Sequence, residues 1–325
     1  MTDRRVASAC EWMRPSMPEP EGPWVTLRPG EGAKTLRGLQ RVWTHALEGG
    51  VDRGSAVLCH GGGVVSDLGG LAAATLLRGV RYATAPTSLL AMVDASVGGK
   101  TAVDHPLGKN LIGAFHHPSV VWVDVAALRT LPARELRSGW AEVVKIAAVR
   151  DLRLLEFLEL HAERVATLAE PSLVEDAVRR AVRAKIDVVA EDERERGPRG
   201  LLNFGHTVGH AVESASRFRL RHGECVAVGC RAALALGESL GVTAPGVAAR
   251  VGALLDRFGL PSTARVSASE AERAMSLDKK RDGASLRFAL VTEAGAGAMR
   301  EVPWPRAREA LHAAIETRSC DESRL

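Results

Sequence analysis

The sequence changes character near residue 130, and this change constrains the fold more than any other feature. Before it, apolar runs such as SAVLCHGGGVV (55–65) and SVVWVDVAAL (119–128) alternate with helical segments and Gly-rich turns. Strands that alternate with helices favour a parallel α/β sheet. After it, successive segments have helical periodicity and few β-branched runs. We therefore predict an α/β domain over residues 26–130 and an all-helical domain over residues 131–325.

Two segments stand outside this division. Residues 1–25 are polar and rich in proline, and we expect them to be poorly ordered. The run LRFALVTEAG (286–295) interrupts the helical half and predicts a short strand pair. A chain of 325 residues exceeds a single core of ordinary size, which agrees with two domains.

Charge and cysteine usage argue against several classes of protein. The net charge is only +4, and the basic residues are interspersed with acidic ones, whereas a nucleic-acid surface needs clustered positive charge. The five cysteines are odd in number and form no CxxC pair, which argues against a disulfide framework and for a reducing cytoplasm. No run approaches the ~20 apolar residues that span a bilayer. We expect a soluble protein with a small anionic substrate and no nucleic-acid or membrane partner.

Three histidines and a glutamate form the main candidate site. In NFGHTVGHAVE, His206 and His210 lie four residues apart and share one helix face. His222 comes at the expected start of the next helix, so two antiparallel helices can bring the three imidazoles together. A third helix offers Glu142. Two histidines and one carboxylate, with positions open for water or substrate, are typical of a catalytic divalent-metal site of the zinc type.

Other interpretations of these histidines stay open. A histidine on an apolar helix is more often a hydrogen-bonded core residue than a metal ligand. The HxxxH pair also lacks the glutamate of the HExxH metalloprotease motif. The pattern alone does not decide which of the three histidines bind the metal.

Glycine-rich turns form a second candidate site. Gly61–Gly63 follow a buried strand and precede a helix with Asp67 near its first turn, where backbone N–H groups can approach a pyrophosphate. The turn is not GxGxxG, so this signal is weak by itself. PGEGAKT, with Glu31 and Lys34, and DASVGGKT, with Lys100, are two further turns of this kind. The spacing in DASVGGKT excludes a P-loop NTPase.

Polar and charged side chains gather in loop contexts in the middle of the chain. They are Arg78, Asp94, Lys100, Lys109 and Asn110. Each by itself is more often a surface residue than a ligand. Together they predict a pocket for a polyhydroxylated phosphate or carboxylate compound.

In their order, the motifs of the chain resemble those of 3-dehydroquinate synthases. The matching segments are PGEGAKTL (29–36), GGGVVSDLGGLAAATLLRGV (61–80), APTSLLAMVDASVGGKTAVDHPLGKNLIGAFHHP (85–118), LPARELRSGWAEVVK (131–145), EDERERGPRGLLNFGHTVGHAVE (191–213) and HGECVAVG (222–229). The likeness runs from about residue 26 to residue 295.

The resemblance implies a Rossmann-like NAD-binding domain followed by a helical metal-binding domain, usually as a homodimer. It implies conversion of 3-deoxy-D-arabino-heptulosonate 7-phosphate to 3-dehydroquinate and phosphate, with zinc or cobalt as the metal. In this family NAD oxidises a substrate hydroxyl transiently. Phosphate then leaves by elimination, the ketone is reduced again, and the ring opens and recloses by an aldol step.

The resemblance also implies a role for each matching residue. Glu142, His206 and His222 match the metal ligands, and His210 matches a histidine that transfers a proton. Arg78, acting across the dimer interface, Lys100 and Asn110 match phosphate contacts, and Asp94 matches a position near the nicotinamide. Substrate carboxylate and hydroxyl contacts match Lys145, Lys185, Arg199, Asn203 and Lys280. The residues that match NAD contacts are Glu31, Lys34, Gly62, Gly63, Asp67, Thr87, Ser88, Lys100, Lys109 and Thr130.

The sequence departs from the family pattern at two places. Ser66 stands where the family has glycine, which would weaken NAD binding if the backbone there required a positive φ. The segment before the first motif is shorter than the family's by at least one βαβ unit, ~30 residues. Either the start of the chain is misassigned or deleted, or the nucleotide-binding sheet is smaller than usual and incomplete.

Three alternative functions remain from the sequence. One is a related sugar-phosphate cyclase of secondary metabolism, with an amino-dehydroquinate, 2-deoxy-scyllo-inosose or valiolone product. Arg199, Asn203 and the segment LDKK argue against it, because they match contacts to a substrate carboxylate. The second is a metal- and NAD-dependent polyol dehydrogenase, which DASVGGKT and LGKN disfavour. The third is a non-catalytic, degenerate homologue, which the intact metal and substrate motifs disfavour.

Overall fold

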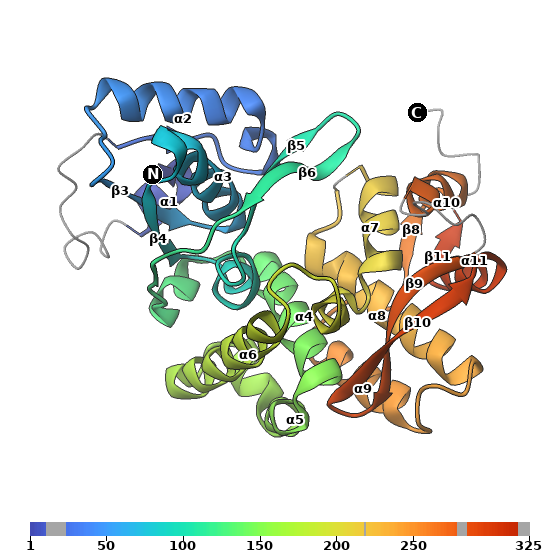
Figure 1. Ribbon diagram of the computed structural model, residues 1–325. Helices are drawn as coiled ribbons and strands as arrows, with labels where there is room; N and C mark the ends of the chain where they lie inside the picture. Colours follow the sequence, from blue (N-terminus) through green and yellow to red (C-terminus); the bar gives the residue numbers. More distant parts are fainter. Residues whose placement is uncertain (11–23, 218, 278–284, 318–325) are drawn as a thin grey trace, which may run out of the picture. The chain divides into compact units, whose positions relative to one another are not determined.

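The computed structural model describes residues 1–10, 24–217, 219–277 and 285–317 of the chain (Figure 1). The chain separates into two compact units, Met1–Pro132 and Ala133–Leu325, near the boundary expected after residue 130. None of the described helices combines the length and the apolar character needed to cross a membrane.

The first unit is built on a five-stranded sheet in which every neighbouring pair of strands is parallel. This arrangement confirms the parallel α/β prediction. In spatial order the strands are β2 (Thr26–Leu27), β1 (Thr2–Asp3), β3 (Ala56–Gly61), β4 (Arg81–Pro86) and β7 (Val120–Val121).

The first ten residues form a strand of this sheet and a short helix, so the expectation that residues 1–25 are poorly ordered is wrong for them. Strand β1 lies between β2 and β3, and Thr2 is paired with Thr26 on one side and His60 on the other. The Asp3 carboxylate then accepts hydrogen bonds from two amides at the start of α1 (Arg4–Ala9). Residues 11–23 lie outside the described part of the chain. The signal was missed because two paired residues are too few to show a strand period.

One longer helix packs directly on this sheet, and a second packs on that helix. Helix α3 (Gly63–Thr75) packs on β3 and β4, and α2 (Leu36–Glu48) packs on α3. The backbone of α3 approaches β3 closely, because a Cβ on Gly69 would overlap the sulfur of Cys59 and lie 2.7 Å from Cε of Met1. The small residues of DLGGLAAAT thus permit tight helix–sheet packing.

The segment after β4 is more regular than the loop that the sequence predicts. It contains a π-helical turn, η4 (Ala91–Ala95), and the antiparallel hairpin of β5 (Lys100–His105) with β6 (Gly108–Phe115), which extends from the sheet (Figure 1). Short 3₁₀ turns lie at η2 (Glu31–Ala33), η3 (Leu76–Arg78) and η5 (Val125–Thr130).

The second unit is helix-rich rather than all-helical. The strand pair expected within 286–295 is the longer hairpin of β9 (Ser285–Glu293) and β10 (Ala296–Pro303), and β8 (Ala264–Val266) pairs with β11 (Ile315–Thr317). The helices, including one 3₁₀ turn, are α4 (Ala133–Arg150), α5 (Leu152–Ala166), α6 (Pro171–Glu191), η6 (Pro198–Asn203), α7 (His206–Ala215), α8 (His222–Ser239), α9 (Val247–Arg257), α10 (Ala268–Leu277) and α11 (Trp304–Ala313).

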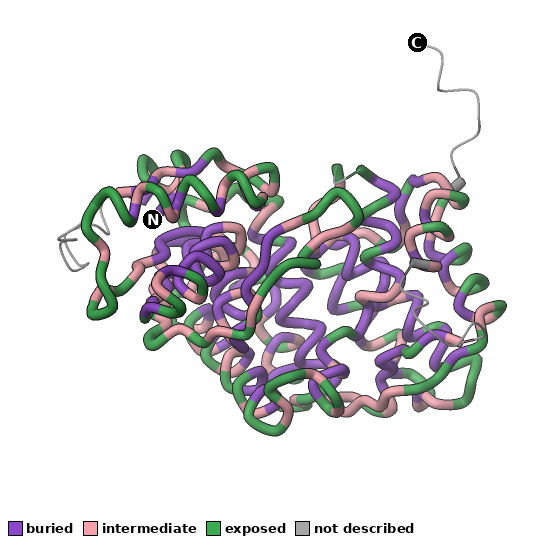
Figure 2. The backbone as a smooth tube through the Cα atoms, turned by 45° about the horizontal axis from the view of Figure 1, so that its top comes forward, coloured by how far each residue is buried: buried purple, intermediate pink, exposed green. Residues whose placement is uncertain are grey.

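Helix α4 is the centre of the second unit. Every residue from Ser138 to Val149 is buried, because α5, α6, α8, α9 and the β9–β10 hairpin all pack against the helix. Figure 2 shows the buried backbone gathered in the interior of the unit. A helix buried on all sides is expected to be apolar all round. Glu142 and Lys145 are the charged residues in this stretch, which marks them as exceptions that need a physical reason.

We predict that Gly69→Ala destabilises the first unit by about 1–3 kcal/mol, because the added methyl group has no space against Cys59. Chemical denaturation measured by circular dichroism tests this. Gly54→Ala is the control, since a Cβ there would meet only the carboxylate of Asp52 at 3.4 Å. Equal stability of the two variants would contradict the packing argument.

Candidate functional site

Glycines allow helices α7 and α8 to pack backbone against backbone. A Cβ on Gly229 would overlap the carbonyl oxygen of Gly205, and one on Gly209 would lie 3.0 Å from the carbonyl oxygen of Cys225. Gly205 also has a left-handed backbone, with φ of 77°, at the start of α7. On the other side of α8, Gly223 lies against the backbone of Ser138 in α4. These contacts bring the first turns of α7 and α8 to the middle of α4.

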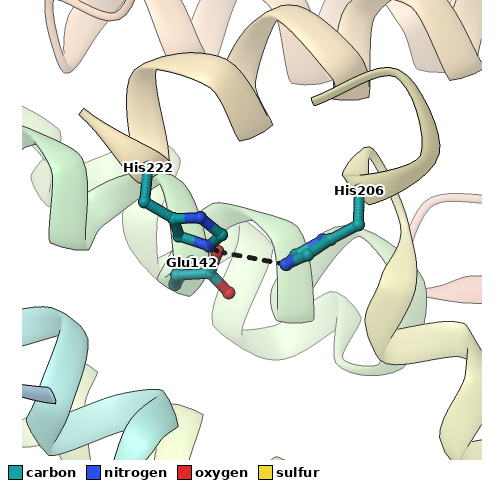
Figure 3. Close-up of side chains that lie close together, drawn as sticks. All are labelled: Glu142, His206 and His222. Atoms are coloured by element: carbon teal, nitrogen blue, oxygen red, sulfur yellow. Dashed lines mark ion pairs between the residues drawn. The ribbon is translucent and has the colours of Figure 1, made fainter. Parts of the chain in front are cut away.

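Glu142, His206 and His222 converge at this place from three helices (Figure 3). The Oε1 atom of Glu142 lies 3.3 Å from Nε2 of His222 and 3.8 Å from Nε2 of His206. One potential ligand atom from each of the three residues lies within 4.8 Å of the others. The sequence predicted this set, and the fold brings it together.

The other ring nitrogen of each histidine faces a hydrogen-bond acceptor. Nδ1 of His206 lies 3.2 Å from the carbonyl oxygen of Phe204, and Nδ1 of His222 lies 3.4 Å from Oε2 of Glu213. A carbonyl or carboxylate oxygen can only accept, so Nδ1 carries the proton in both rings. When both rings are neutral, as metal ligation requires, their Nε2 lone pairs are directed to the side of Glu142.

Glu142 is a buried carboxylate whose two oxygens are not fully hydrogen-bonded within the protein. The residue is 2% exposed, and neither carboxylate oxygen makes a hydrogen bond of regular geometry, although Nζ of Lys145 lies 2.5 Å from Oε2. Burial by itself would raise the pKa of Glu142, but Lys145 and the two histidines hold that pKa well below its usual range. A buried anion beside two oriented imidazoles fits a divalent cation.

The two imidazoles differ in their affinity for protons. Burial, with the nearby charge of Lys145, moves the pKa of His206 well below its usual value. Burial acts in the same direction on His222, but Glu142 and Glu213 outweigh it and raise that pKa to about 10. In the metal-free protein, His222 is therefore an imidazolium at neutral pH, with a second proton on Nε2. Metal binding at Nε2 must release it.

His210 lies beside this set with a more exposed side chain. Its ring centroid is 5.0 Å from that of His206 and 6.0 Å from that of His222. His210, Glu213 and His222 also form a second group of possible ligands. The buried Glu213 was not singled out from the sequence, although its place three residues after His210 on one helix face was a usable signal.

The remaining candidates of the second unit occupy separate elements. Lys185 in α6 and Arg199 in η6 are buried, and Arg199 donates to the carbonyl oxygen of Glu193. Asn203, at the end of η6, is exposed and donates to the carboxylate of Glu195 at 2.6 Å. Elements α4, α6 and η6 pack together. Lys280 lies outside the described residues.

In the first unit, the predicted nucleotide residues gather at the carboxyl ends of β3 and β4. Helix α3 begins at Gly63 with no side chain bonded to its first amides, and the amide of Thr87 donates to the carbonyl oxygen of Gly61 at 3.0 Å. A Cβ on Gly62 would lie 3.4 Å from Oγ of Ser88. Ser66 is buried inside α3 and is not among the residues with positive φ, so the strain considered for it is absent. A helix N-terminus beside adjacent parallel strands fits a dinucleotide pyrophosphate.

A second group in the first unit surrounds the buried amine of Lys34. Its Nζ lies 2.5 Å from Oδ2 of Asp67 and 3.7 Å from the Glu31 carboxylate, which also faces Lys109 at 3.6 Å. Burial raises the pKa of Asp67 to about 6 even though Lys34 opposes the shift. Lys34 also donates to the side-chain oxygen of Asn110. The predicted NAD contacts Glu31, Lys34, Asp67 and Lys109 are therefore together, and Asn110, predicted as a phosphate contact, joins them.

The four other predicted residues of this unit lie on separate elements. Arg78 follows α3 with a left-handed backbone, φ 70°, and Asp94 lies in the π-helical turn η4. Lys100 is exposed at the start of β5. The hydroxyl of Thr130 donates to the carbonyl oxygen of Ala127, and it lies 3.5 Å from the sulfur of Cys10.

Comparison with known proteins matches both units to one family. Residues 24–138 match the family described as 3-dehydroquinate synthase N-terminal, and residues 139–281 match 3-dehydroquinate synthase C-terminal. The chain is 44% identical over 292 residues to a 3-dehydroquinate synthase of Nostoc punctiforme, covering 88% of this chain and 80% of that one. It is 48% identical over 240 residues to that of Symbiobacterium thermophilum, covering 74% and 67%.

Solved structures with the same fold hold the expected cofactors. A 2-epi-5-epi-valiolone synthase from Streptomyces hygroscopicus, with NAD⁺ and Zn²⁺ bound, is 28% identical with a TM-score of 0.86, covering 96% of this chain and 88% of that one. A 2-deoxy-scyllo-inosose synthase, complexed with carbaglucose-6-phosphate, NAD⁺ and Co²⁺, is 26% identical with a TM-score of 0.84, covering 96% and 89%.

We predict that Gly229→Ala weakens Zn²⁺ binding at least tenfold, because the methyl group pushes α8 away from α7 and separates the two histidines. Competition with a chromophoric chelator measures the affinity. Gly252→Ala in α9 is the matched helical control, since a Cβ there would meet only the end of the Arg231 side chain at 3.2 Å. Wild-type affinity in a folded Gly229→Ala protein would show that the close contact is not required.

Proposed function

The chain belongs to the 3-dehydroquinate synthase family, and we propose that it converts 3-deoxy-D-arabino-heptulosonate 7-phosphate to 3-dehydroquinate and phosphate. The proposal rests on one observation above the others. Glu142, His206 and His222 converge with their ligand atoms facing one another, within a chain whose two halves both match this family.

NAD and a divalent metal are the cofactors. When bound, NAD supplies the transient oxidation of one substrate hydroxyl, and a metal held by Glu142, His206 and His222 supplies polarisation of the substrate oxygens. Similar structures hold NAD⁺ with Zn²⁺ or Co²⁺. The nitrogen and oxygen donors of the three ligands suit either of these metals.

The side chains around the metal ligands are suited to moving protons and binding anions. His210 is exposed beside the ligand set, so its imidazole can accept the proton of the substrate hydroxyl during oxidation. Lys145 keeps Glu142 ionised, and its ammonium group can also donate to a substrate oxygen. We assign Asp94 to a position near the nicotinamide.

The anionic groups of the substrate need cationic and amide partners. We assign the phosphate to Arg78, Lys100 and Asn110 of the first unit. We assign the carboxylate and ring hydroxyls to Lys185, Arg199, Asn203 and Lys280 of the second unit. Lys34 bonds to the side-chain oxygen of Asn110, and Asn203 donates one N–H to Glu195, so both amides keep further hydrogen-bonding atoms for the substrate.

The related cyclases of secondary metabolism are the second candidate, because structures similar to the chain carry those names. They are 26–28% identical to the chain, whereas the 3-dehydroquinate synthases of Nostoc punctiforme and Symbiobacterium thermophilum are 44% and 48% identical. This difference favours a substrate that carries a carboxylate.

We predict that the protein with NAD and Zn²⁺ or Co²⁺ releases phosphate from the heptulosonate phosphate and forms 3-dehydroquinate. His206→Ala or a chelator should lower the rate by about a thousandfold, because metal polarisation contributes several kcal/mol. Coupled phosphate assay and product absorbance measure this. His161→Ala, a histidine of α5 outside the site, is the control. Turnover of glucose 6-phosphate or sedoheptulose 7-phosphate instead of the heptulosonate phosphate would support the second candidate function. If none of the three substrates is turned over, both candidate functions are contradicted.

We further propose a cytoplasmic homodimer in which Arg78 serves the site of the partner subunit. We predict that mixed dimers of Arg78→Ala and His206→Ala chains recover activity, because one site then has both groups intact. Differently tagged chains, purified together and assayed for phosphate release, test this. Mixed dimers without activity would place Arg78 in its own subunit's site, and a monomer in sedimentation would contradict the dimer.

A further inference from the structure

We infer that Glu213 is a positioning residue for the metal site, which fixes the tautomer and the ring orientation of His222. The inference deepens the proposed function and rests on the metal ligands assigned there. Glu213 is 5% exposed in the last turns of α7, and its Oε2 lies 3.4 Å from Nδ1 of His222.

The contact acts on the ligand through the chemistry of imidazole. A neutral imidazole carries its proton on either Nδ1 or Nε2, and only the unprotonated nitrogen can bind a metal. A carboxylate beside Nδ1 keeps the proton there and leaves the Nε2 lone pair on the side of Glu142, 3.3 Å from its Oε1. Such carboxylate–histidine pairs commonly strengthen metal binding.

His222 depends on a side chain for this orientation, whereas His206 does not. Nδ1 of His206 faces the backbone carbonyl of Phe204, which no substitution removes. A mutation of Glu213 can therefore abolish the alignment of His222, whereas no single side chain among the described residues controls the alignment of His206 in this way.

Glu213 and His222 could instead form a second cation site with His210. That arrangement requires His222 to bind one ion through Nε2 and another through Nδ1, so the ring would have to lose both protons. A neutral imidazole offers only one lone pair. With the first site formed, Glu213 accordingly serves as a hydrogen-bond acceptor and not as a ligand.

The test compares Glu213→Gln and Glu213→Ala with wild type. The glutamine oxygen can still accept from Nδ1, whereas alanine removes the acceptor. Glu238→Ala, an exposed residue of α8, is the control that removes the same charge. Zn²⁺ affinity and stoichiometry come from chelator competition, the visible spectrum of the Co²⁺ protein reports ligand geometry, and ¹⁵N NMR of the imidazoles in the metal-loaded protein reports the tautomer.

We expect Glu213→Ala to weaken Zn²⁺ binding by about 10–100-fold and to change the Co²⁺ spectrum. Glu213→Gln should retain most of the affinity and the Nδ1–H tautomer, and Glu238→Ala should match wild type. A purely structural role for Glu213 would lower thermal stability without these changes. If Glu213→Ala does not fold, the Zn²⁺ affinity of Glu213→Gln and the His222 tautomer measured by NMR still test the inference.

Two results would overturn the inference. One is wild-type Zn²⁺ affinity and an unchanged Co²⁺ spectrum in folded Glu213→Ala. The other is a wild-type protein that binds two ions, of which Glu213→Ala loses one while the tighter ion is unaffected. Both results differ from failure of the proposed metal site itself. In that case, the wild-type protein would bind no Zn²⁺ at Glu142, His206 and His222, and His206→Ala would not change Zn²⁺ binding.

Discussion

A carboxylate buried at the centre of the second unit is the constraint on which the rest of this structure depends. Transfer of an ion from water to a protein interior costs several kcal/mol, so Glu142 needs compensating charge from its surroundings. Lys145 supplies it from the same helix, and His222 from the start of α8. A carboxylate in the buried part of a helix where only Lys145 is also charged needs a functional reason, and the two converging imidazoles indicate a metal.

The geometry around Glu142 is set by backbone contacts rather than by long side chains. Gly223 lets α8 touch α4, and Gly229 lets it touch the start of α7. Histidines reach a shared point only when the helices that carry them come this close. The first unit follows the same principle with other residues, since Gly69 brings α3 onto β3 and the buried amine of Lys34 is balanced by Asp67.

Part of this arrangement follows from the sequence because it depends on local period and order. The alternation before residue 130 predicted the parallel sheet, and the periodicity after it predicted that the second unit consists mostly of helices. The i,i+4 histidines and the helix that follows them predicted a metal site, and the order of motifs assigned the ligands. The periodicity of the sequence did not predict elements that are very short or that depend on strand pairing, such as β1 and the β5–β6 hairpin.

The sequence by itself determined the two-part architecture through its periodicity and the family through the order of its motifs. Glu142, His206 and His222 were predicted as metal ligands from the resemblance to that family. Tertiary structure alone decided how the groups are used. It placed Thr2 and Asp3 between two strands that come later in the sequence, and it joined Asn110 to Lys34. It also set Glu213 against the far nitrogen of His222. The physical reason is that burial, tautomer and pairing depend on distances between residues far apart in the chain, which no local pattern encodes.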